Sequence, residues 1–550
     1  MKAGKIVFLI CAAAAFFLSA NSAALAQCTC IAVGKKASAD GSCMITHNDD
    51  SDVGDVRLWI IPAADWPKGA TKEIVIDSHS YGDFGKYPHG NFPYKEAYGQ
   101  GQVAGQMPQA EHTYRHFHCR YSFMNEKGLA MGETTCGIKG TKHAEEVKEA
   151  MMEVKGSIDI WFCMDIALKR CAKAKETVRV IGELVEKYKW YGGTEPGNGE
   201  CIVITDGYEV WIMEIYGRDL WCAVKLADDH VFVSANRFRI RNVDFKDKKN
   251  VMHSPNLISY AVEKDWYDPK GKESFRPADI YGPKRSALSS SCREWRALDL
   301  IAPSLELKYD DCNSPYSLYP FSVKPDKKLT VDDVFKITGD NYEGTRFDRT
   351  KGPGSGAFGN PVVKRVNGAY GINRRTTLYG QISQVKGWLP EAIKGVVWFG
   401  YGAQDSTYPT PLNPNMKELP KFYSTGSRYK DFDINSGWWV NTRVTHLAEY
   451  CYSEAIKDID AFREPKLQML YQTVPKLQSL AAELYKTEPN AAMNILHHFY
   501  YNNAVAMHEE WKRLGDMLLA KYNANNPREA VPEYPDWWKK LIGSEDDSNK

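Results

Sequence analysis

Short strand-like runs of mostly apolar residues, separated by turn residues, predict β-strands in the first part of the chain. Segments 29–33 and 42–47 are strand-like, and the stretch between them contains the turn pair Asp40-Gly41, which predicts a hairpin. Further strand-like runs follow at 57–61, 73–76, 121–124 and 129–131. We therefore expect the chain after residue 28 to enter a sheet at once.

A helical pattern replaces the strand-like runs over 158–190, where apolar residues recur at intervals of three and four. This spacing predicts two consecutive helices. Strand-like runs resume at 201–205, 210–215, 221–226 and 231–235, and turn residues separate them. A strand set, a helix pair and a second strand set are typical of a layered α+β sandwich.

Two long amphipathic stretches, 438–457 and 465–522, predict helices near the C-terminus. No Pro/Gly/Ser-rich linker divides the 550 residues, so we expect one large domain with an appended region. The expected division is a signal segment over 1–26, a domain over 27–435 and a helical region over 436–550.

Residues 1–26 have the pattern of a secretory signal. Lys2 and Lys5 precede an apolar run over 6–18, and small residues follow up to Ala26. We therefore expect an exported protein, periplasmic or secreted, whose mature chain begins near Gln27. The apolar run is too short to span a bilayer as a stable helix, and we expect no membrane partner.

The chain carries 70 basic and 69 acidic side chains, which gives a formal net charge of +1. A balance so close to neutral removes any general electrostatic reason to expect nucleic acid or an anionic lipid as a partner. A small molecule or a peptide is the expected partner.

Cys28 stands almost at the expected new N-terminus, where a thiol has a chemical use. A free α-amine has an ordinary pKa of about 7.7 to 8.0, so it can accept the proton of its own residue's thiol and act as an internal base. The alternative is that Cys28 and Cys30 are ordinary buried or disulfide-bonded cysteines, since export favours some disulfides. The Cys-Thr-Cys spacing alone favours that alternative. The position at the cleavage site strengthens the interpretation of Cys28 as a nucleophile without making it the favoured one.

The residues around Cys28 resemble the mature start of the dipeptidase family that includes secernins, with CTCIAVGKKAS over 28–38 and DGS over 40–42. Similarities in the same order continue over most of the mature chain. They are NEKGLAMGE (125–133), WIME (211–214), SANRFRI (234–240), REWRA (293–297), YPFSVKP (319–325), YEGT (342–345), SQ (383–384), WLP (388–390) and GVVWFG (395–400).

This resemblance implies the αββα four-layer sandwich of N-terminal-nucleophile (Ntn) hydrolases, related to choloylglycine hydrolases and penicillin V acylases. It implies cleavage of small peptides with no metal and no organic cofactor. In that family the first cysteine is the nucleophile, which indicates Cys28. Asp50 matches an Asp that helps to hold the α-amine, and Asn236 matches an Asn whose amide helps to form the oxyanion hole. Arg293 matches an Arg near the nucleophile that would lower the thiol pKa.

Each of the last three residues also has a plainer interpretation. Asp50 would otherwise be a solvated loop acid, Asn236 a turn residue at the end of a strand, and Arg293 a helix-surface cation. The sequence leaves these alternatives open.

The chain departs from its relatives at two positions near the expected site. His47 stands where the acylases and many dipeptidases carry Arg, and because His titrates near neutrality it makes a pH-dependent site possible. Gln27 stands between the expected signal cleavage and Cys28. It must be removed, or the internal-base mechanism fails.

The resulting hypothesis is an exported cysteine dipeptidase whose catalytic residues are Cys28, Asp50, Asn236 and Arg293. One alternative is an amidase of N-acyl amino acids or bile-acid conjugates, and another is an exported binding protein with Cys28 in a disulfide. A metal site at His112, His116, His118 and Cys119 is not expected, because their spacing fits no regular ligand pattern. The sequence leaves open whether the helical C-terminal region supports a homo-oligomer or shapes the site.

Overall fold

The computed structural model describes residues 27–51, 54–76, 102–138, 142–193, 196–283, 288–309, 319–362, 365–428, 431–523 and 532–543. The expected signal segment 1–26 and Cys312 lie outside the described residues. Helices and strands are mixed along the chain, which confirms the predicted α+β class.

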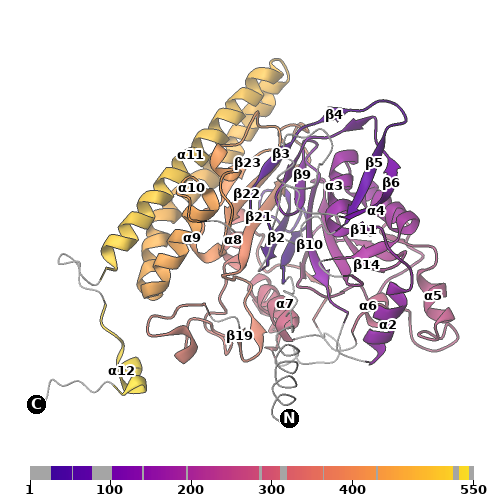
Figure 1. Cartoon of the computed structure of the whole chain (residues 1–550), viewed down its shortest axis with the longest axis horizontal. Coiled ribbons are helices and arrows are strands. Elements are labelled where there is room, and N and C mark those ends of the chain that lie inside the picture. The colour runs from indigo at the N-terminus through magenta and orange to yellow at the C-terminus, as the bar shows by residue number, and fades with distance from the viewer. Residues whose placement is uncertain are drawn as a thin grey trace, which may run out of the picture.

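Two antiparallel sheets form the centre of the protein (Figure 1). In spatial order the first sheet contains β18 (Ser322–Val323), β16 (Val231–Ser234), β1 (Cys30–Val33), β2 (Cys43–Asp50), β21 (Thr377–Val385), β22 (Gly395–Tyr401) and β23 (Thr410–Leu412). The second contains β17 (Val251–His253), β15 (Leu220–Lys225), β14 (Val210–Gly217), β13 (Gly199–Thr205), β10 (Ala130–Cys136), β9 (Ser122–Asn125), β8 (His116–His118) and β3 (Trp59–Ile61).

The two sheets pack face to face, with β10 and β13 against β2. Gly132 on β10 allows the close approach, because a Cβ atom there would lie 2.7 Å from the carbonyl oxygen of Thr46 on β2. Polar contacts also join the sheets: the Cys30 thiol donates to the Glu133 carbonyl oxygen at 3.1 Å, and the hydroxyls of Thr134 and Ser234 lie 2.6 Å apart. The region between the sheets around Cys30 is therefore closely packed and partly polar.

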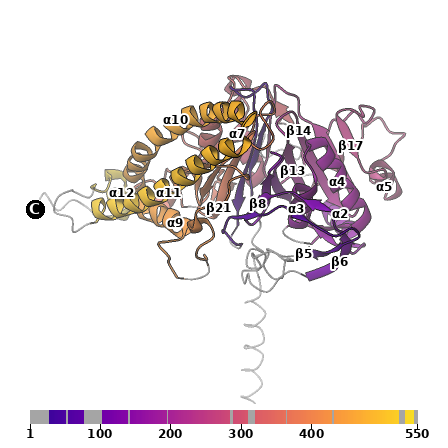
Figure 2. The same ribbon diagram turned by 90° about the horizontal axis from the view of Figure 1, so that it is seen from above.

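Helices cover the outer face of each sheet, as Figure 2 shows. On the second sheet lie α3 (Ile160–Arg170) and α4 (Ala174–Tyr188), with α2 (Lys142–Met152) beside them. On the first sheet lie α7 (Leu288–Ile301), α8 (Val331–Thr338) and α9 (Gly437–Ala448). The order of layers is thus helix, sheet, sheet, helix.

Shorter elements connect these layers. They are β4 (Ala64–Asp65), β5 (Thr71–Ile76), β6 (Gln102–Pro108), β7 (His112–Thr113), β11 (Ile158–Asp159), β12 (Trp190–Gly192), β19 (Arg365–Val366), β20 (Ala369–Tyr370), α5 (Leu257–Glu263) and α6 (Pro277–Tyr281).

Local patterns predicted the central elements well. The expected N-terminal hairpin is confirmed, since β1 pairs with β2 in antiparallel register with Ala32 opposite Ile45. The helical pattern over 158–190 gives α3 and α4, and Asp159 begins α3 as a cap by accepting from the backbone N–H of Phe162 at 2.9 Å. The four strands expected over 201–235 are β13 to β16.

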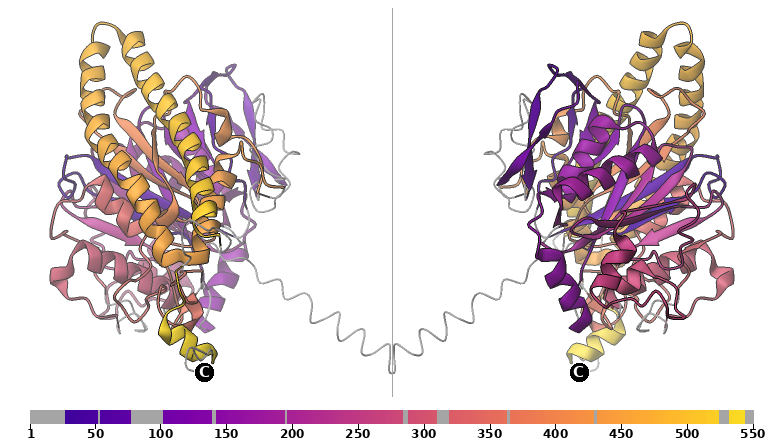
Figure 3. Two further views of the ribbon diagram at one scale, coloured as in Figure 1. Left: turned by 90° about the vertical axis from the view of Figure 1, so that its left-hand side faces the viewer. Right: turned by 90° about the vertical axis from the view of Figure 1, so that its right-hand side faces the viewer.

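The C-terminal helices differ from the predicted ones in their bounds. The predicted break before residue 465 is wrong, because α10 (Tyr452–Tyr485) runs through Pro465 and Pro475. The turn lies instead at 486–488, and α11 (Pro489–Lys521) begins with proline at its first position. Proline fits that position, where its missing N–H would have no helical partner. Figure 3 shows the resulting hairpin as the long orange and yellow helices along one side of the molecule.

Arg463 attaches this hairpin to the sheets. It lies on α10, and its guanidinium donates to the backbone carbonyl oxygens of Asp405 and Thr407, each at 2.8 Å. A short helix, α12 (Asp536–Ile542), follows near the C-terminus. The division into a domain over 27–435 and a region over 436–550 stays a prediction, with α9 beginning at Gly437.

No helix in the described ranges is both long enough and apolar enough to cross a membrane.

Gly132→Val should lower the free energy of unfolding by about 1–3 kcal/mol, because the added side chain would press β10 away from β2. Urea unfolding followed by circular dichroism measures the change. Gly137→Ala is the matched control, since a Cβ atom at Gly137 would have no neighbour within 4 Å. Equal stability of the two variants would contradict the close packing inferred at Gly132.

Candidate active site

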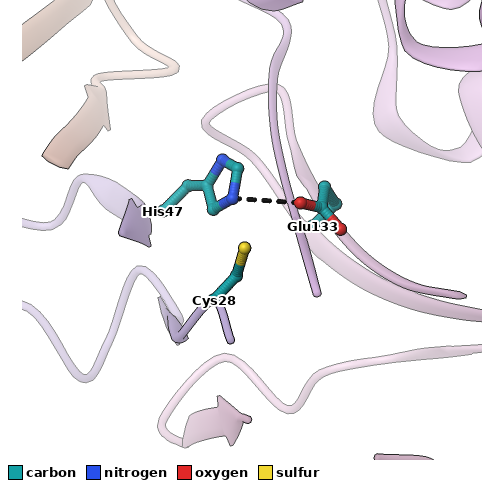
Figure 4. A group of neighbouring side chains, drawn as sticks. All are labelled: Cys28, His47 and Glu133. Atoms are coloured by element: carbon teal, nitrogen blue, oxygen red, sulfur yellow. Dashed lines mark ion pairs between the residues drawn. The ribbon is translucent and has the colours of Figure 1, made fainter. Parts of the chain in front are cut away.

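Three chemically different side chains converge between the sheets: the thiol of Cys28, the imidazole of His47 and the carboxylate of Glu133 (Figure 4). One possible ligand atom from each lies within 4.8 Å of those from the other two, and all three residues are fully buried. His47 Nε2 is 3.1 Å from a carboxylate oxygen of Glu133. A thiol, an imidazole and a carboxylate therefore share one site that bulk water does not reach.

The pairing of strands explains this convergence. Cys28 precedes β1, and the neighbouring Thr29 is bridged to Asn48, one residue beyond His47 on β2. Glu133 follows Gly132, the residue of β10 that lies closest to β2. The His47 ring is fixed by edge-to-face packing on Tyr121 and Tyr379, with ring centroids 5.1 and 5.9 Å away.

Burial raises the pKa of the Cys28 thiol well above its ordinary value. The negative charges of Glu133, Asp49 and Asp50 raise it further, while the backbone N–H of Asp50 lowers it. The resemblance implied a thiol pKa lowered by Arg293. With Gln27 attached the opposite direction is found, because desolvation and the carboxylates dominate.

The acids around the thiol are held in different states. Burial would raise the pKa of Glu133, but His47 and Arg120 outweigh this effect and lower it. The pKa of Glu200 is raised well above its ordinary value by burial and by the adjacent charge of Glu133. Asp49 is paired with Arg120 at 2.8 Å, although burial raises its pKa. Glu133 is thus the ionised member of a buried carboxyl pair.

Arg293 is fully buried on α7, so the helix-surface interpretation of this residue is wrong. One guanidinium nitrogen donates to the carbonyl oxygens of Gln27 and Cys28 at 2.7 and 2.6 Å and to the Thr29 hydroxyl at 2.9 Å. The other donates to the side-chain oxygen of Asn236 at 2.8 Å. Arg293 therefore holds the backbone of Gln27 and Cys28 and the side chain of Asn236 in a fixed relation.

Asn236 is both a turn residue and a site residue. Its backbone has φ = 62°, a left-handed conformation that Asn tolerates better than most residues. One N–H of its amide donates to the Thr135 carbonyl oxygen at 2.9 Å. Within the described residues the second N–H makes no hydrogen bond, so it is able to donate to a developing negative charge.

Asp50 is buried at the end of β2, which excludes the solvated-loop interpretation. Its pKa is raised to about 6, and burial is the cause. The charges of Arg374 and Arg293 and the hydrogen bond from the Thr377 hydroxyl, at 2.5 Å, act in the opposite direction and limit the rise. Arg374 also donates to the side-chain oxygen of Gln27 at 3.2 Å. Gln27 itself donates its backbone N–H to the Asp50 carbonyl oxygen at 3.1 Å.

Sequence reasoning singled out Cys28, Asp50, Asn236 and Arg293, and the structure brings all four into one network of contacts. It missed Glu133, Glu200, Arg374 and the Asp49–Arg120 pair. The only available signal was that Glu133 ends the 125–133 similarity.

The four residues rejected as a metal site have separate environments. His112 contacts Asp65, His116 contacts Asp165, and His118 contacts the Ser122 hydroxyl. The Cys119 thiol donates to the Val56 carbonyl oxygen. Within the described ranges, the group able to hold a metal ion is Cys28, His47 and Glu133.

Comparison with known families places this site in context. A model of peptidase family C69 matches residues 27–465, most of the chain, and the match begins one residue before Cys28. The chain belongs to peptidase family C69. It is therefore a cysteine-type peptidase, a hydrolase of peptide bonds.

Curated relatives of this C69 peptidase are named dipeptidases. A probable dipeptidase of Latilactobacillus sakei is 26% identical over 448 residues, which cover 79% of this chain and 84% of the relative. Dipeptidase A of Lactobacillus helveticus is 23% identical over 489 residues, covering 88% and 95%. A dipeptidase of Bifidobacterium longum is 23% identical over 491 residues, covering 84% and 85%.

Arg293→Met in the C69 peptidase should lower the free energy of unfolding by about 1–3 kcal/mol, because buried carbonyl groups would lose their donor. Chemical denaturation measures this. Arg179→Met on α4, where the side chain is 61% exposed, is the same substitution without buried partners and should change stability by less than about 0.5 kcal/mol. Indistinguishable variants would mean that Arg293 does not hold the site together.

Proposed function

We propose that this protein is an exported dipeptidase that hydrolyses small peptides with Cys28 as an N-terminal nucleophile. The observation that carries the proposal is the buried, free Cys28 thiol, on which His47, Glu133 and the Arg293 network converge at the start of the C69 match. The naming of the three relatives as dipeptidases supports a dipeptide as the substrate.

Removal of Gln27 would convert the peptide nitrogen of Cys28 into an α-amine. That amine takes the thiol proton, and the thiolate attacks the peptide carbonyl carbon. The C–N bond then breaks, the departing amine receives the proton, and a thioester remains on Cys28. Water hydrolyses the thioester, which releases the acid and restores the thiol.

The surrounding groups fit distinct tasks in this sequence. The second N–H of the Asn236 amide would donate to the oxyanion of the tetrahedral intermediate. The Asp50 carboxylate would stabilise the ammonium form of the new N-terminus. Arg293 would position the Cys28 backbone, and the buried site would exclude competing water.

We further infer that the four layers form the αββα sandwich of Ntn hydrolases. Its support is that the chain enters an inner strand of the first sheet directly after Cys28, with the second sheet packed on the same region. Export is supported by the residue pattern of 1–26. N-terminal sequencing of protein recovered outside the cytoplasm tests export and maturation together: a start at Cys28 is expected, and an active enzyme starting at Gln27 would contradict the amine's role.

Cys28→Ala should abolish hydrolysis of dipeptides and leave the circular dichroism spectrum unchanged, because the alanine fills the same buried position without a nucleophile. Cys163→Ala, a buried cysteine on α3 outside the site, is the matched control and should keep the parental rate. Parallel assays with N-acyl amino acids and bile-acid conjugates test the amidase alternative. Parental dipeptide hydrolysis by Cys28→Ala would exclude Cys28 as the nucleophile.

The pH dependence should report Asp50. As the pH falls through the pKa of about 6, the carboxyl gains a proton and can no longer stabilise the ammonium group, so kcat/KM should fall more steeply there than protonation of the α-amine, whose ordinary pKa is about 7.7 to 8.0, explains on its own. The α-ammonium of the mature enzyme would itself lower this pKa, which sets pH 6 as the upper end for the parental midpoint. Thr377→Val removes a donor to the ionised carboxylate, so the acid limb should move to higher pH than in the parent. An unmoved limb would exclude Asp50 as its origin.

A further inference from the structure

The atoms of Cys28, His47 and Glu133 have a second chemical use besides nucleophilic catalysis. Thiolate, imidazole and carboxylate are the three side-chain ligands of protein zinc sites. In a tetrahedral zinc site, neighbouring ligand atoms lie roughly 3.3 to 3.7 Å apart, as follows from metal–ligand bonds of about 2.0 to 2.3 Å. His47 Nε2 and the Glu133 oxygen are 3.1 Å apart, and the three ligand atoms lie within 4.8 Å of one another. A small contraction of the group would therefore place all three around one ion.

The polar atoms of this group are poorly satisfied by the protein. Within the described residues, Nδ1 of His47 is buried without a hydrogen-bond partner, while Nε2 contacts Glu133 and the Glu133 carboxylate also interacts with Glu200. The hydroxyls of Tyr121 and Tyr379, which surround the His47 ring, are also buried without a partner. Buried polar atoms in proteins are normally satisfied by a partner, water or an ion, so this concentration of them points to a ligand.

Carboxyl groups and arginines surround the group, and Glu133 is the carboxylate that reaches it directly. Besides Glu133, the carboxyl groups of Asp49, Asp50 and Glu200 all bear electrostatically on Cys28 or Glu133. Arg120 faces Asp49 and Glu133, while Arg293 and Arg374 face Asp50. Glu200, adjacent to Glu133, lies where a second carboxyl group can orient a carboxylate ligand.

We propose that Cys28, His47 and Glu133 form an inhibitory binding site for one divalent cation of the zinc class. The inference deepens the proposed function, because it rests on Cys28 being the nucleophile that the ion blocks. Binding forms an S–metal bond and releases to solvent the thiol proton and any proton carried by the His47 imidazole or the α-amine, with no change in oxidation state. In the mature chain the α-amine of Cys28 supplies a fourth donor, which closes a five-membered chelate ring with its own sulfur. The ion is not a cofactor, since it occupies the electron pair that attacks the substrate.

His47 is the residue that makes the site. An arginine at this position would present a guanidinium, which pairs with a carboxylate and cannot bind a metal ion. This chain presents an imidazole nitrogen to the same carboxylate, 3.1 Å away. Sensitivity to zinc-class ions should therefore depend on this one position.

Co²⁺ titration of the purified, metal-free protein tests the proposal independently of catalysis. One equivalent should bind and produce the near-ultraviolet charge-transfer band of a thiolate–Co²⁺ bond, and Zn²⁺ should displace it. Cys28→Ser should lose the band. His47→Gln and Glu133→Gln should each weaken Co²⁺ binding by at least about tenfold, whereas His112→Gln, at a half-exposed histidine outside the site, should not change it.

Inhibition provides the second measurement. Zn²⁺ should suppress dipeptide hydrolysis at one equivalent, and EDTA should restore it. Absence of the thiolate band, or a band unaffected in both His47→Gln and Glu133→Gln, would overturn the metal site while leaving the dipeptidase proposal intact. A normal Co²⁺ spectrum in a protein without dipeptidase activity would instead count against the proposed function alone.

Discussion

A single buried guanidinium, that of Arg293, holds together the segments that make the candidate active site. It reaches the carbonyl oxygens of Gln27 and Cys28 with one nitrogen and Asn236 with the other. These groups belong to the start of the described chain, the turn after β16 and the helix α7. Because the guanidinium is planar and rigid, it fixes the Cys28 backbone and the Asn236 side chain as one unit.

The electrostatics of the site follow from placing this network between two sheets. Cys28, His47 and Glu133 are fully buried, so bulk water does not stabilise the charges of the site. The pKa values of the acids therefore diverge: contacts with His47 lower that of Glu133, while burial and the charge of Glu133 raise that of Glu200. The pKa of a thiol surrounded in this way stays raised until a nearby amine or cation stabilises the thiolate.

Local patterns in the sequence were enough for the strands and helices of the central layers, because apolar runs between turn residues mark strands such as β13 and β14 that are buried along their whole length. They failed at Pro465, where tertiary contacts such as those of Arg463 hold a helix that local propensity would break. Asp50, Asn236 and Arg293 came from resemblance to a family. Glu133 and Arg374 meet Cys28 and Gln27 only through sheet packing, so no local pattern could have shown their roles.

The burial of Gln27 has a consequence for the life history of the protein. Gln27 is 8% exposed, and the next residue, Cys28, is fully buried. The Gln27 backbone N–H donates a hydrogen bond to Asp50, and its side-chain oxygen accepts one from Arg374. A protease acting from solvent meets the Gln27–Cys28 bond only in molecules whose first strand has detached from the sheet. Under the proposed mechanism, removal of Gln27 would therefore compete with packing of this strand on the sheet, and a molecule that folds first would keep Gln27 and lack the α-amine.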